Sequence, residues 1–76
     1  MKGFVLISLR EGSERRIVRE LKSYSQVRNV HILFGEWDLL AEIDTSHPEE
    51  LGTFVMDRIR ARPDVKLTSS LIVAGQ

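Results

Sequence analysis

The sequence predicts an α+β domain in which four antiparallel strands form one sheet and two helices pack on one of its faces. Short apolar runs rich in β-favouring residues, two amphipathic helical segments and one tight hairpin connection occur in the order β-α-β-β-α-β. This order folds naturally as a two-layer domain. The chain has 76 residues, so we expect a single domain spanning residues 1–76.

The first strand is predicted over residues 4–9, where an apolar run ends at a turn that contains Gly12. Ser13 is a residue type that commonly caps a helix, so a helix is expected to begin there. The apolar residues that follow recur at helical spacing, with arginine and lysine on the opposite side. They are Ile17, Val18, Leu21 and Tyr24.

A hairpin is predicted in the middle of the chain. Residues 27–34 are strand-like, residues 35–38 (Gly-Glu-Trp-Asp) make a tight connection, and the strand over residues 39–43 alternates with Glu42 and Asp44. His31 alone breaks the apolar pattern of the earlier strand, so the sequence does not assign His31 to a face.

The second helix has a strong start signal. Ser46, Pro48 and Glu49 predict a capping box with an early proline. The helix continues to Arg60, and Pro63 stops the chain from continuing it. Its buried stripe is expected to be Leu51, Phe54, Val55 and Ile59, with Arg58, Arg60 and Arg62 near its carboxyl end.

The last strand, residues 65–73, raises the question of what covers the second face of the sheet. Strict alternation places Val65, Leu67, Leu71 and Val73 on one face and Lys66, Thr68, Ser70 and Ile72 on the other. Two helices cover only one face, and a domain this small buries only about 60% of its unfolded surface. A face that carries Leu33, Leu40 and Ile72 among polar groups therefore favours an interface between copies of the chain.

Composition excludes several classes of function. Without cysteine there is no disulfide, and two histidines alone cannot build a closed zinc site. The net charge is zero, but it divides into +4 before Gly35 (seven basic, three acidic residues) and −4 after it (four basic, eight acidic). This balance argues against bulk capture of nucleic acid or membrane. No apolar run has the length of a membrane span and no signal peptide is evident, so we expect a cytoplasmic protein.

Catalytic motifs are missing from the sequence. We find no Gly-x-Ser-x-Gly elbow, no phosphate-binding Gly-rich loop, no His-Glu-x-x-His and no cysteine nucleophile. We therefore expect no enzyme activity, no cofactor and no metal. The arginine-rich face of the first helix is interleaved with glutamates, which favours a solvated surface over a nucleic-acid patch.

Two features together fit a small zwitterionic ligand. Gly35, which can take a positive φ, Trp37 and Asp38 crowd one hairpin, and Thr68 and Ser70 point the same way from one strand. Each feature alone has a simpler explanation: an ordinary turn in which the aspartate bonds its own backbone, and hydroxyls on the less apolar face of a strand. Jointly, the aspartate could meet an ammonium group while hydroxyls and turn amides meet a carboxylate.

The order of these motifs resembles the effector-binding domain of the Lrp/AsnC regulators, also called RAM. The resemblance rests on the Gly-Glu-Trp-Asp hairpin, the helix over residues 48–60, Pro63-Asp64-Val65 and the final Thr-Ser-Ser-Leu-Ile-Val segment. It covers nearly the whole chain. It implies a ferredoxin-like fold whose sheets pack face to face in barrel-like dimers, which assemble into octamers or decamers.

The resemblance also implies an amino-acid effector bound between dimers. By position, Gly35 and Asp38 correspond to the hairpin of the family's site, Thr68 and Ser70 to its Thr-x-Thr pair, and His31 to an aromatic or histidine position before the hairpin. Ser70 departs from the commoner threonine, and Phe34 replaces a small polar residue. The family's helix-turn-helix is not found before the first strand, so we expect no direct DNA binding and consider mixed assembly with a full-length regulator.

An enzyme is the alternative. Dimeric ferredoxin-like sheets also form small monooxygenases and isomerases, for which His31, Trp37 and Asp38 could line a cleft. On its own, a histidine in a strand is more often packed and hydrogen-bonded than catalytic.

Overall fold

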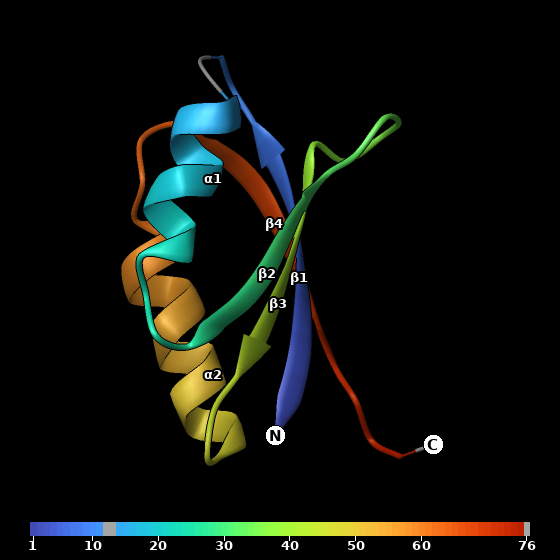
Figure 1. The fold of residues 1–76 in the computed structure, drawn as a ribbon, viewed down its shortest axis with the longest axis vertical. Coiled ribbons are helices and arrows are strands. Elements are labelled where there is room, and N and C mark those ends of the chain that lie inside the picture. Colours follow the sequence, from blue (N-terminus) through green and yellow to red (C-terminus); the bar gives the residue numbers. More distant parts are fainter. Residues whose placement is uncertain (12–13, 76) are drawn as a thin grey trace.

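The computed structural model describes residues 1–11 and 14–75 as a four-stranded antiparallel sheet with its helices on one face (Figure 1). The elements are β1 (Lys2–Leu9), α1 (Glu14–Lys22), β2 (Val27–Ile32), β3 (Leu39–Asp44), α2 (Pro48–Phe54), η1 (Val55–Arg60) and β4 (Val65–Ile72). The strand order is β2-β3-β1-β4. The predicted fold class and element order are confirmed; the predicted cap at Ser13 lies outside the described residues.

The core lies between the helices and the inner face of the sheet. Along β1 and β3 the buried and partly exposed side chains alternate, as expected of strands covered on one side. Tyr24 and Phe54 make an edge-to-face contact in this layer, their ring centroids 5.4 Å apart. Fully enclosed members of the core are Val5, Ile7, Ile17, Leu21, Leu39, Ala41, Ile43 and Ile59.

The start of the second helix differs from the predicted capping box between Ser46 and Glu49. The N-cap is His47, in an extended conformation and with no side-chain capping bond. Thr45 is buried and its hydroxyl donates to the carbonyl of His47 at 3.0 Å, which holds the segment before the helix extended. Glu50, not Glu49, reaches back to accept the Ser46 N–H at 3.3 Å.

The same helix changes its winding halfway. α2 runs directly into η1, a π-helical segment that ends at Arg60. The sequence did not indicate this change, because Val55 and Ile59, both buried, fit an α-helical stripe equally well. The predicted extent of the helix, to Arg60, is confirmed.

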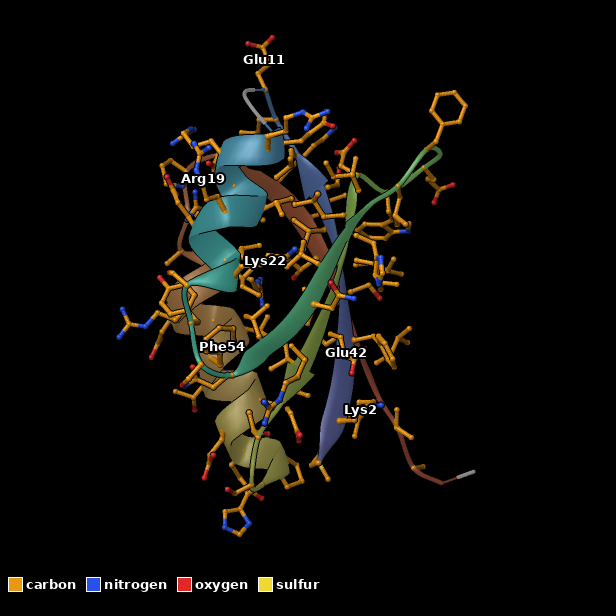
Figure 2. The ribbon with its side chains drawn as sticks, in the orientation of Figure 1. Lys2, Glu11, Arg19, Lys22, Glu42 and Phe54 are labelled. Carbon is orange, nitrogen blue, oxygen red and sulfur yellow. The ribbon has the colours of Figure 1, made fainter. Side chains whose placement is uncertain are left out.

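The outer face of the sheet carries no helix (Figure 1). Cross-strand partners share a face, and Leu6 pairs with Leu40 on one side and with Ser69 on the other. His31 also pairs with Leu40, which places His31 on this outer face. Figure 2 shows the side chains of Lys2 and Glu42 on the same side, where they form an ion pair of 3.5 Å.

A β-bulge in β4 corrects the predicted faces of the last strand. Ser8 pairs with Leu67, but the next residue, Leu9, pairs with Val65, so Lys66 has no cross-strand partner. One extra residue reverses the alternation beyond it. Val65 therefore faces the helices and is 7% exposed, whereas Leu67 lies on the outer face and is 57% exposed.

Several predicted assignments change as a result. Thr68 and Ser70, predicted on the uncovered face together with Ile72, pair with Ile7 and Val5 and therefore lie on the helix side. Ile72 pairs with Gly3 on the helix side, so its predicted place on the outer face is wrong. Leu71, predicted to share a face with Val65, pairs with Phe4 on the outer face and is 53% exposed. The uncovered face is thus more apolar along β4 than the sequence indicated.

Candidate ligand-binding site

Asp38 ties the hairpin, here defined as residues 33–38, to the end of β1. Its backbone N–H donates to the Ile7 carbonyl at 3.0 Å, and its carboxylate Oδ2 accepts the Leu9 N–H at 2.7 Å. Its carbonyl accepts the Leu33 N–H at 2.8 Å. The carboxylate thus accepts a hydrogen bond from β1 rather than from its own turn. One of its two oxygens is already occupied by this charge-assisted bond.

Gly35 and Trp37 are the other predicted site residues in the hairpin, which projects beyond the sheet on the side away from the helices (Figure 1). Gly35 does not use the positive φ that only glycine takes easily, and an added Cβ would meet no atom within 4 Å. Trp37 is half-buried and Phe34 is fully exposed. The hairpin therefore presents Gly35 and Phe34 to its surroundings.

Thr68 and Ser70 lie on the same face of β4, as their spacing predicts. Thr68 pairs with Ile7 and Ser70 with Val5, both of which point toward the helices. β4 is an edge strand, so Thr68 is only half-buried and Ser70 is exposed. The hydroxyls of Thr68 and Ser70 therefore lie side by side on this edge strand and are open to a ligand.

The six predicted residues do not converge within one chain. His31 lies on the outer face, whereas Thr68 and Ser70 lie on the helix side. Leu39, next to Asp38, and Thr68 are both cross-strand neighbours of Ile7, so they lie two strand spacings, about 10 Å, apart. A ligand that touches all six residues needs contributions from more than one copy of the chain.

His31 has no catalytic partner among residues 1–11 and 14–75. Its Nε2 lies 3.3 Å from Nδ2 of Asn29, and the ring is exposed. No group of three metal-binding side chains occurs in the described part of the chain. None of the described helices is long and apolar enough to span a bilayer.

Thr68 is the one predicted site residue that lines a pocket of about 330 Å³ at the η1 end of β4. The pocket is bounded by Arg10, Arg60, Val65, Lys66, Leu67 and Thr68. Sequence reasoning missed this site because its residues come from the position after β1, from the end of η1 and from β4. The spacing of Lys66 and Thr68 in one strand was the only local signal.

An ion cluster beside this pocket was also missed. Arg62 donates from Nε and Nη2 to the two carboxylate oxygens of Asp64, at 3.0 and 3.1 Å, and from Nη2 to Glu20 at 2.7 Å. Arg16 lies 3.6 Å from Glu20 and 3.7 Å from Asp64. Arg62 thus binds α1 to the loop before β4, a role beyond its predicted place near the carboxyl end of the second helix.

This ion cluster makes stability depend on pH in the acid range. The hydrogen bonds from Arg62 hold the pKa of Asp64 below its ordinary 3.8 and the pKa of Glu20 below its ordinary 4.5. Hydrogen bonds to Asp64, then to Glu20, raise the pKa of Arg62 in turn. A carboxylate whose folded pKa is depressed stabilises the fold above its unfolded pKa and loses that contribution as pH falls through the folded value.

We therefore expect the unfolding free energy at constant ionic strength to be flat between about pH 7 and 5.5 and to fall below about pH 4.5. Urea denaturation at a series of pH values measures this. The Arg62→Met variant should show a shallower fall, since its two carboxylates titrate near their ordinary values. Equal slopes in the two proteins would contradict the assignment.

Comparisons with known proteins agree with this fold. The profile of the Lrp/AsnC ligand binding domain matches residues 2–76. The HTH-type transcriptional regulator FL11 of Pyrococcus abyssi is 32% identical over 73 residues, which cover 96% of this chain and 48% of FL11. The chain spans less than half the length of the curated relatives it matches.

Solved structures show the same architecture. TTHA0845 from Thermus thermophilus is similar with a TM-score of 0.90 and 27% identity, over 99% of this chain and 94% of that one. The regulator NMB0573 of Neisseria meningitidis, solved as an L-Met complex, shares the fold at 21% identity and a TM-score of 0.83, over 99% and 50% of the two chains. Sequence profile and fold agree, and the chain belongs to the Lrp/AsnC ligand binding domain family.

Proposed function

We propose that this chain is an amino-acid-binding regulatory module that acts as an assembly of several copies. Membership of the Lrp/AsnC ligand binding domain family and the regulators among its relatives support a regulatory role. The L-Met bound by the more distant NMB0573 supports an amino acid as the class of ligand.

The observation that carries the proposal is the pair of open hydroxyls at the edge of the sheet. Thr68 and Ser70 share the helix side of β4 and are available to a carboxylate. Asp38, with one oxygen held by Leu9, offers its other oxygen to an ammonium group. In this proposal, the hairpin and the hydroxyls that meet one ligand belong to different copies of the chain.

Assembly through the outer face of the sheet is part of the proposal. The chain exposes 5130 Å², against about 4,700 Å² for a compact monomer of its mass. Leu67, Leu71 and Phe34 contribute to this excess. We propose a dimer formed on this face and a ring of eight or ten copies. The effector signal would pass to a full-length regulator by mixed assembly, without direct DNA contact by residues 1–76.

Thermal denaturation in the presence of each common amino acid tests the ligand. We expect at least one of them to raise Tm by about 10–20 °C at a hundredfold excess over Kd. Asp38→Asn keeps an oxygen for the Leu9 N–H and removes the charge, so it should fold and lose this response. Thr68→Val should weaken the response.

Thr53→Val is the matched control, because Thr53 is exposed on α2. It should respond to the amino acid as the unmodified chain does. If no amino acid changes Tm while light scattering shows an intact assembly, the proposed ligand class is wrong.

A further inference from the structure

Three cations surround the 330 Å³ pocket without a carboxylate among its lining residues. Arg10, Arg60 and Lys66 supply the charge, and Thr68 supplies a hydroxyl. All six lining residues belong to the described part of the chain. This concentration is local, because the chain as a whole has a net charge of zero.

Backbone features from three elements bring these cations together. Arg10 follows β1, and its N–H donates to the Asp64 carbonyl at 2.9 Å, which fixes the chain there against the loop before β4. Lys66 is the bulged residue of β4, and bulges commonly redirect a side chain beside a binding site. Arg60 ends the π-helical segment. The relative positions of the three cations are therefore set by the fold and not by one flexible segment.

The nearest acidic side chain of the loop does not neutralise the pocket. Asp64 is already held by both arms of Arg62 and lies 3.7 Å from Arg16. Within the described ranges, Arg10, Arg60 and Lys66 form no ion pair. Unpaired cations converging on one hollow leave a positive potential that an anion would relieve.

We propose that this pocket binds a small dianion, either a dicarboxylate or a phosphate group. A guanidinium presents two parallel N–H donors to such oxygens, and a lysine adds a point charge. A pocket of about 330 Å³ lies at the lower end of the usual range for small ligands. The site shares Thr68 with the proposed amino-acid site, but the inference rests on the pocket alone.

Isothermal titration at low ionic strength tests this site with inorganic phosphate and with glutarate. We expect saturable binding of at least one of them, and which one binds identifies the dianion. Arg60→Gln and Lys66→Gln should each raise Kd at least tenfold. Arg15→Gln removes the same charge from an exposed position on α1 outside the pocket and should leave Kd within twofold.

Two results would overturn the inference. One is the absence of saturation with either probe; the other is an equal loss of affinity in the Arg15→Gln control, which would indicate diffuse attraction. Asp38→Asn separates this site from the proposed function, since glutarate and phosphate lack an ammonium group and should bind it unchanged. If neutral amino acids bind but phosphate and glutarate do not, this inference is wrong and the proposed function is unaffected.

Discussion

The Arg62→Met variant is expected to lose about 2–4 kcal/mol of unfolding free energy. The guanidinium donates three hydrogen bonds to two carboxylates, and Arg62 and Asp64 are 17% and 15% exposed. The loss is assigned to the pair with the less exposed Asp64, since bonds to charged groups contribute about 1.5–3 kcal/mol. Glu20 is 43% exposed, so solvent screens its bond and no share of the loss is assigned to it. At about 4–8 °C per kcal/mol, Tm should fall by about 10–25 °C in calorimetry at fixed protein concentration.

Two further variants separate the geometry of Arg62 from its charge. Arg62→Lys keeps the charge but not the planar fork, so it should recover less than half of the loss. Arg19→Met makes the same exchange on an exposed part of α1 and should change the unfolding free energy by less than about 0.5 kcal/mol. A loss this small in Arg62→Met itself would show that the ion cluster does not hold α1 to the loop.

If the outer face forms the proposed interface between copies, Leu71→Glu is expected to convert the assembly to monomers. Leu71 is 53% exposed on the outer face of the sheet, so the change leaves the fold of one chain intact. In an interface that pairs two copies of this face, an unpaired carboxylate costs about 3–5 kcal/mol, which raises the dissociation constant at least about a hundredfold. Sedimentation velocity at micromolar concentration measures the result.

Met56→Glu is the matched control for this change. Met56 is 62% exposed on η1, on the other side of the sheet from Leu71. It should keep the assembly state of the unmodified chain. A monomeric unmodified chain, or an assembled Leu71→Glu variant, would show that the outer face of the sheet is not the interface.

The order of the helices and strands could be predicted because the spacing of apolar residues within each short segment indicates its type. Alternation and helical spacing are local properties, so the position of the hairpin could be predicted. Its length was wrong, because β2 ends at Ile32, two residues before the predicted end of that strand. The faces of β4 could not be predicted in the same way. The apolar pattern over residues 65–73 fits a regular strand without a bulge. The bulge at Lys66 arises only when β4 pairs with β1.

The candidate site was predictable only where its residues are neighbours in sequence. Thr68 and Ser70 share a face because they are two apart in one strand. His31 required the pairing of β2 with β3, since its neighbours are apolar on both sides. Arg62 and Glu20 are separated by 42 positions, so no local pattern predicts their contact.

Because the Leu9 N–H donates to Asp38, the exchange of this one backbone proton reports on the position of the hairpin. Its acceptor is a side chain from residues 33–38, so this amide becomes open to solvent when the hairpin moves off the sheet. Such local opening costs less than global unfolding, and amide hydrogen exchange resolves the two. The exchange rate at Leu9, followed as ligand or protein concentration is raised, therefore records how often the hairpin leaves the end of the first strand.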